Sequence, residues 1–326
     1  MTDLITAIAA IVLGPLATFG LYALLNFLIN LLPTDKVREA VRPYVFIGPV
    51  LVLIGVLLVY PTVQSMVFSF MNEDSTVFVG FENYVKLFGD RTFLTTVGTN
   101  LLWVAVVPIT TIVVGLFIAT LTDKLGTVRE RIFKSIIFMP MAISFVAASS
   151  IWRLNYQWDA GDTQIGMLNA FVKAIGGTPI AWMQTDTLAL NSLLIMVIVI
   201  WANAGFAMTL LSAAIKAVPE ETTEAAALDG ATGAQAFFQI VLPQIWGTVV
   251  SVFITVLISS MKIFDVIWGM TGGNFGTNVL GVDFFLQYFV YNDTGKATAV
   301  VMLLMLAIIP VMYYQVRSYR KQEEIR

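Results

Sequence analysis

The chain contains no cysteine and no histidine, and its charged residues are scarce. Of its 326 residues, 12% are Asp, Glu, Lys or Arg, whereas soluble domains carry about a quarter. Without cysteine there are no disulfides or thiolate metal sites, and without histidine there are no imidazole ligands or histidine general bases. We therefore expect no metal site, no cofactor and no catalytic residue.

A phosphate-binding loop is also missing. The pattern G-x-x-x-x-G-K-[ST] cradles nucleotide phosphates, but Gly295-Lys296 lacks the earlier glycine and is followed by Ala297. No basic tract typical of nucleic-acid binding occurs either. If the protein takes part in an ATP-driven process, another subunit must bind the nucleotide.

Long apolar blocks dominate the chain, which is 58% hydrophobic. A helix needs about 20 mostly apolar residues to cross a bilayer, and in lipid every backbone amide must be paired within the protein. We therefore predict an all-α, polytopic transmembrane helix bundle. Its seven spans are 5–32, 44–70, 97–121, 136–152, 188–211, 245–264 and 298–316. Gly115 and other glycines and prolines in these spans mark kinks or close helix contacts.

Lysine and arginine are distributed unevenly between the loops, which predicts the orientation. One set of loops holds twelve of these residues and the opposite set five. The richer set, which we predict to be cytoplasmic, comprises 33–43, 122–135, 212–243 and 317–326. The N-terminus is then outside and the C-terminus cytoplasmic.

The loop 212–243 has the pattern of a helix followed by a sharp turn. Pro219 suits the first helical position, and Glu220 and Glu221 fall in the first turn, where the helix dipole favours negative charge. Three alanines follow, and Gly230 permits the left-handed conformation that ends a helix. We predict a helix from about 219 to 228 that turns at Asp229-Gly230.

This loop resembles the EAA loop of binding-protein-dependent ABC permeases, which docks in a groove of the ATPase subunit. The resemblance implies an ATPase-coupling role for seven residues: Glu224, Ala225, Ala226, Asp229, Gly230, Leu242 and Pro243. The alternative is a solvated helix without a partner.

The resemblance extends over most of the chain from about residue 43. Segments 78–84, 138–145 and 270–277 resemble the maltose-type sugar permeases, and the alpha-glucoside permease subunit most closely. It implies a type I importer fold with four parts. They are 1–43, an extra transmembrane helix and linker; 44–94, a helix and periplasmic loop; 95–316, the permease domain; and 317–326, a cytoplasmic tail.

The resemblance also implies the function and the partners. The chain is expected to be a bacterial inner-membrane permease subunit that imports an alpha-glucoside or a maltose- or trehalose-like disaccharide. Its expected partners are an ABC ATPase pair, a second homologous permease subunit and a periplasmic or lipid-anchored sugar-binding protein.

Polar residues in two spans are candidates for the sugar path, because polar groups in membrane helices tend to face the bundle interior. Asn203 and Phe206 lie three residues apart, on one helical face. Ser259, Ser260 and Ile263 are the candidates in the next span. In the family pattern these positions line the sugar site. For the serines, helix packing is an equal alternative.

Three rival functions remain open. An ion-coupled secondary sugar carrier needs ionisable groups at membrane depth, and only Lys262, Asp265 and Arg153 qualify. Lys262 and Asp265 more simply form a local pair on one helical face. An intramembrane enzyme needs a nucleophile–base pair or paired carboxylates, and none is apparent. The third rival is a scaffold protein.

Overall fold

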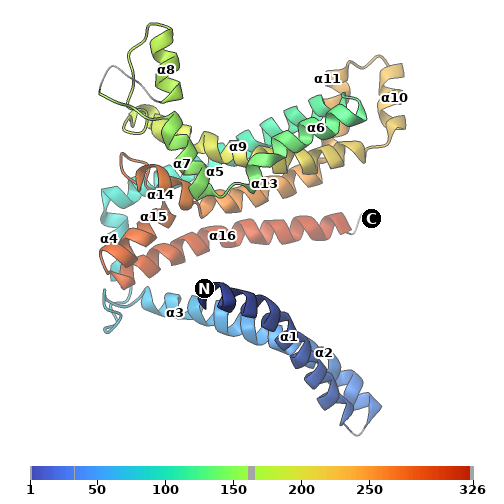
Figure 1. Cartoon of the computed structure of the whole chain (residues 1–326), viewed down its shortest axis with the longest axis vertical. Helices are drawn as coiled ribbons and strands as arrows, with labels where there is room; N and C mark the ends of the chain where they lie inside the picture. The colour runs from blue at the N-terminus through green and yellow to red at the C-terminus, as the bar shows by residue number, and fades with distance from the viewer. Residues whose placement is uncertain (1, 33, 161–165, 324–326) are drawn as a thin grey trace. The chain divides into compact units, whose positions relative to one another are not determined.

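A computed structural model of the chain describes residues 2–32, 34–160 and 166–323, which fold almost entirely into helices (Figure 1). Among these residues the only β pairing is an isolated bridge between Met71 and Phe78. The all-α prediction is confirmed. Arg326, one of the basic residues used to predict the orientation, lies outside the described residues. The chain divides into two compact units, Met1–Val67 and Phe68–Arg326.

The first unit is a helical hairpin. Its elements are α1 (Thr2–Asn30), α2 (Asp35–Ile54), η1 (Gly55–Val59) and α3 (Tyr60–Phe68). The Tyr22 hydroxyl of α1 donates to the Phe46 carbonyl of α2 at 3.2 Å, and the two rings stack with centroids 5.7 Å apart. The helix that contains the second predicted span begins at Asp35, before the predicted start of the span at residue 44. Charged residues of the linker form its first turns.

The second unit holds the remaining helices. They are α4 (Glu82–Gly89), α5 (Arg91–Asp123), α6 (Thr127–Phe138), η2 (Met139–Ala142), α7 (Phe145–Asn155), α8 (Met167–Ala174), η3 (Thr187–Ala189), α9 (Leu190–Lys216), α10 (Glu220–Leu228), α11 (Gly233–Ala236), η4 (Phe237–Val241), α12 (Leu242–Gln244), α13 (Trp246–Met261), α14 (Asp265–Thr271), α15 (Leu280–Phe285), η5 (Leu286–Val290) and α16 (Thr294–Glu323).

The described residues contain four helices long and apolar enough to cross a membrane, or six spans if two bent helix pairs are counted. Six of the seven predicted spans correspond to these. The first predicted span corresponds to α1, whose side chains lie outside the described residues over most of its first half.

The predicted span 136–152 is not one straight helix but a bent pair. The α6–η2 segment and α7 meet at 100°. The chain is extended at Ile143 and Ser144, with ψ of 130° and 147°. The Ser144 hydroxyl then accepts from the Ala147 N–H at 3.2 Å and starts a new helix. A run of apolar residues does not reveal such a break, because hydropathy measures only its length and composition.

The predicted pairing of Lys262 with Asp265 on one helical face is also wrong. Helix α13 ends at Met261, and Lys262 and Phe264 have non-helical backbone angles. Asp265 begins the next helix, α14. Lys262 therefore follows the end of α13 while Asp265 belongs to α14, and the two do not share a helical face.

Helices α5 and α9 form the centre of the second unit. Trp103, Met196 and Met208 are fully buried there. At Gly115 the helices approach so closely that an added Cβ would lie 2.7 Å from the Ala207 Cβ. In lipid, helices associate by such close packing of small residues. The predicted close contact at Gly115 is confirmed.

Different short helices lie at the two ends of the long helices in the second unit (Figure 1). The helices α10 and α11 lie at one end. The helices α4, α14 and α15 lie at the other. The predicted cytoplasmic loop is therefore at the opposite end of α5 and α9 from the loops predicted to face outward.

Candidate coupling site

Helix α10 starts directly after a proline. Pro219 has φ −60° and ψ 133° and is the N-cap residue, so α10 begins at Glu220. The prediction that Pro219 is the first helical residue is wrong by one position, because its ψ is extended. Glu220 and Glu221 lie in the first turn, where their charges interact favourably with the helix dipole.

Gly230 ends α10 as predicted. Its φ is +83°, a conformation that glycine adopts without a steric penalty. The Gly230 N–H donates to the Ala227 carbonyl at 3.1 Å, and the Ala231 N–H donates to the Ala226 carbonyl at 2.9 Å. These two bonds satisfy carbonyls that a helix end leaves free, so the turn has a fixed geometry.

The second half of the loop is fixed by a capping box. The Thr232 N–H donates to Gln235 Oε1 at 2.8 Å, and the Gln235 N–H donates to Thr232 Oγ1 at 3.3 Å. Helix α11 continues through η4 into α12 and then bends by 72° into α13. The loop is therefore a rigid helix–turn–helix joined to α9 at one end and to α13 at the other.

The seven predicted coupling residues divide by exposure. The exposed ones are Glu224, Ala225, Asp229, Gly230 and Pro243. Leu242 is half-buried, and Ala226 is only 6% exposed. The exposed surface of the loop is thus acidic and made of small residues, while Ala226 and Leu242 face the interior of the loop.

Two large apolar side chains of the loop were missed by the sequence analysis. Leu228 is 89% exposed and Phe238 is 65% exposed. Exposed apolar groups beside a polar rim are typical of protein contact sites. The signal for Leu228 was in the sequence, because it is the only large apolar residue between Glu220 and Asp229.

A cavity of about 1190 Å³ lies between the loop and the end of α5. Glu224, Thr223 and Phe237 line it from the loop, and Leu116 and Lys124 line it from α5 and the segment after it. The loop and the end of α5 therefore line opposite walls of this cavity.

An ion-pair cluster holds α6 against the end of α9, next to the start of the loop. Lys216 Nζ lies 2.6 Å from Glu130 Oε1 and 3.8 Å from Asp123 Oδ1. Lys134 also pairs with Glu130 and donates to the Ser212 hydroxyl. Glu130 is only 12% exposed in its side chain, so this carboxylate has two cationic partners in a partly buried place.

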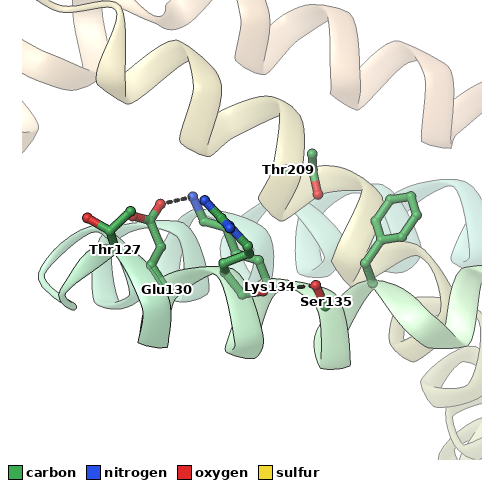
Figure 2. A pocket seen from close by; sticks show the side chains of 7 residues that line it. Thr127, Glu130, Lys134, Ser135 and Thr209 are labelled. Carbon is green, nitrogen blue, oxygen red and sulfur yellow. Dashed lines mark hydrogen bonds and ion pairs between the residues drawn. The ribbon is translucent and has the colours of Figure 1, made fainter.

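Figure 2 shows Glu130 and Lys134 pointing toward one another along α6, with Thr209 of α9 nearby. Together with Thr127 and Ser135 they line a cavity of about 430 Å³. The cluster fixes the last turn of α9 only a few residues before α10 begins.

The predicted sugar-path residues lie inside the bundle, except Ser259. Asn203 is half-buried and donates to the Val199 carbonyl at 2.8 Å, and Phe206 packs against the main core. Ser260 and Ile263 are buried, whereas Ser259 is exposed. None of these residues lines the two cavities beside the coupling loop.

Across the part of the chain that the structure describes, no three acidic side chains gather in a way that could hold a metal ion.

Comparisons with known proteins give consistent matches. A family model described as "Binding-protein-dependent transport system inner membrane component" matches residues 111–323. The alpha-glucoside transport system permease protein AglF of Rhizobium meliloti is 39% identical and covers 99% of both chains. The osmoprotective compounds uptake permease protein GgtC of Synechocystis is 40% identical, over 86% of this chain and 100% of that protein.

A solved structure has the same fold. In a crystal structure of a bacterial alginate ABC transporter in complex with an alginate pentasaccharide-bound periplasmic protein, one chain aligns with a TM-score of 0.76. The alignment covers 88% of this chain and 96% of that chain at 17% identity.

Proposed function

Since the chain belongs to the family of inner membrane components of binding-protein-dependent transport systems, we propose that it forms half of the pore of an ATP-driven sugar importer. Members of this family are multi-pass pore components, and a separate subunit hydrolyses ATP. The predicted family resemblance and the ABC permease fold are confirmed. The observation that carries the proposal is the rigid, exposed loop 212–243.

The loop is proposed to couple the pore to the ATPase pair. Glu224, Asp229 and the small residues around them form a polar surface, and Leu228 provides an apolar anchor beside it. Buried apolar anchors surrounded by polar contacts carry most of the binding energy at protein interfaces. The Leu228 side chain would enter the groove of the ATPase, while Glu224 would fix the position of α10 along that groove.

Movement of the loop would be transmitted to the membrane part by its two attachments. Helix α10 follows α9 directly, and α12 leads into α13. Because the loop is held by its capping hydrogen bonds, a displacement at α10 moves both helices rather than bending the loop. The pore would then alternate between outward-facing and inward-facing states.

The proposed substrate is an alpha-glucoside or a maltose- or trehalose-like disaccharide. The name of the Rhizobium relative supports the sugar class. The name of the Synechocystis relative states osmoprotective compounds, so small polyol osmolytes belong in the test panel as well. Competition uptake with disaccharides and polyols identifies the substrate.

The proposed sugar path includes Asn203, Phe206, Ser259, Ser260 and Ile263. Its support is the inward position of most of these side chains on helices that flank the coupling loop. Asn203→Ala and Ser260→Leu test the proposal. A raised KM supports sugar contact, and normal uptake with unchanged KM removes both residues from the path.

The remaining proposals concern the assembly. We propose that the partners are an ATPase pair, a second homologous permease and a sugar-binding protein, and that the C-terminus is cytoplasmic. The division into 1–43, 44–94, 95–316 and 317–326 also stays a proposal. Along the chain, the boundary between the two compact units falls between Val67 and Phe68, which is within the second of these parts.

The coupling proposal is tested by charge reversal in the assembled transporter. Glu224→Lys should abolish ATP-dependent uptake and weaken copurification of the ATPase. Glu39→Lys is the matched control, because Glu39 is exposed on α2, outside the loop. If uptake by the two variants is equal, Glu224 has no coupling role.

A further inference from the structure

A cavity with several polar side chains in its wall lies at the end of α5 opposite the coupling loop. It has a volume of about 610 Å³ and is enclosed by the start of α5, the connection between α14 and α15, and the segment from α15 to Tyr291. Its polar lining includes Asp90, Thr96, Thr99, Asn278, Asp283 and Gln287. We refer to it as the α5–α15 cavity.

Two oxygen acceptors in its wall have no partner among the described residues. They are Asp283 Oδ2 and Asn278 Oδ1, although the Asp283 carboxyl as a whole interacts with the side-chain amides of Gln287 and Asn278. Asp283 is only 8% exposed. A buried acceptor without a donor is unfavourable by about 1–3 kcal/mol, and more when it is charged, so most such groups in native structures are paired with protein atoms or ordered water. A ligand that donates hydrogen bonds would satisfy both oxygens.

The cavity wall is held in place before any ligand arrives. Thr99 Oγ1 donates to the Gly276 carbonyl at 3.3 Å, and the Asn278 amide donates to Thr96 Oγ1 at 3.1 Å. The Leu280 N–H donates to Asn100 Oδ1 at 3.2 Å. These bonds tie the α14–α15 connection to α5, and a preorganised wall lowers the entropy lost on binding.

The lining indicates a neutral polyhydroxylated ligand. The charged side chains are Asp90, Arg91 and Asp283, so the cavity has no strong excess of one sign. Threonine hydroxyls can both donate and accept, and the exposed Tyr291 offers an aromatic face. The volume lies within the range of about 300–1,000 Å³ that small-molecule sites have.

We propose that the α5–α15 cavity is a sugar-binding subsite, distinct from the path within the bundle, in which Asp283 and Asn278 accept hydrogen bonds from sugar hydroxyls. The proposal rests on the proposed sugar-import function. It places a sugar at the end of the permease opposite the ATPase-coupling loop, before translocation.

The test measures uptake kinetics in the complete transporter with its binding protein, using the sugar that the competition panel identifies. Asp283→Leu removes the acceptor and should raise KM about tenfold, which corresponds to about 1.4 kcal/mol, with kcat unchanged within about twofold. Gln287→Leu, on a half-buried residue of the same wall, should raise KM several-fold. Asp74→Asn is the control, because Asp74 is exposed and does not line the cavity.

Each other outcome contradicts the proposal. If Asp283→Leu and Gln287→Leu fold but leave KM unchanged, or lower only kcat, the cavity is not a sugar site. If alkylammonium compounds rather than sugars compete at the cavity, it receives a basic group instead. If the wild-type transporter moves no sugar at all, the proposed function itself fails, which is distinguishable from the first result.

Discussion

At the scale of single residues, Gly230 is the position where backbone conformation matters most for the coupling loop. Its φ of +83° is the left-handed conformation, which is unfavourable by roughly 1–2 kcal/mol for other residues. We expect Gly230→Val to lower ATP-dependent uptake up to about tenfold. Gly233→Ala is the control, because Gly233 begins α11 with nothing within 4 Å of an added Cβ. Equal uptake by the two variants would show that the turn geometry is unimportant.

The buried carboxyl of Asp283 should make the stability of the folded protein depend on pH. Burial raises the pKa of this carboxyl, and nearby Asp90 adds to the rise, whereas the amides of Gln287 and Asn278 oppose it. Arg91 is the other charged group of the cavity. Between the ordinary pKa of 3.8 and the raised value, the folded state binds the proton more strongly than the unfolded state. Stability therefore falls as pH rises through this window and stays lower above it.

We accordingly expect Asp283→Asn to unfold at a higher temperature than wild type at neutral pH. The difference should shrink as the pH is lowered toward 3.8. Thermal unfolding of the detergent-purified protein measures this. A difference that is independent of pH would show that Asp283 is not a buried ionisable group.

At the scale of helices, packing of α5 on α9 sets the centre of the bundle. An added Cβ at Gly115 meets Ala207 at 2.7 Å, so a large side chain there must push the helices apart. Overpacking of this kind is unfavourable by about 1–3 kcal/mol. We expect Gly115→Leu to lower the unfolding temperature, whereas Gly98→Leu, with no atom within 4 Å of an added Cβ, should not. Similar unfolding temperatures would argue against close packing at Gly115.

Most of the long helices could be predicted from the sequence, because each long apolar run identifies a span by itself, whereas short helices such as α4, α14 and α15 were not predicted. The end of α10 was equally predictable, since Gly230 is a local signal. The 100° break between α6 and α7 was not, because its cause is an extended backbone at Ile143 and Ser144 within an apolar run.

The parts of the sites that depend on distant contacts were not predictable. Lys216 and Glu130 are 86 positions apart, and Asn278 and Thr96 are 182 apart. No periodicity or spacing connects such pairs; only the folded chain brings them together. The sequence therefore indicated the coupling loop but neither the ion-pair cluster beside it nor the α5–α15 cavity.

At the scale of the whole molecule, the orientation in the membrane is open to a clean test. The chain has no cysteine, so one introduced cysteine is the only thiol. Asp74 and Asp229 are both exposed and lie in loops predicted to face opposite sides. A membrane-impermeant maleimide should label Asp74→Cys in intact spheroplasts and Asp229→Cys only after lysis. The reverse pattern would invert the predicted topology.

The proposed contact between the ATPase pair and the loop 212–243 can be tested by cross-linking. The most direct measurement is site-specific cross-linking of the complete transporter through a single cysteine at the exposed Leu228 position. A short cross-linker should join Leu228→Cys to the ATPase subunit in high yield, and Glu39→Cys should give no such product. If Leu228→Cys never cross-links to the ATPase in a complex that imports sugar, the loop is not the coupling element.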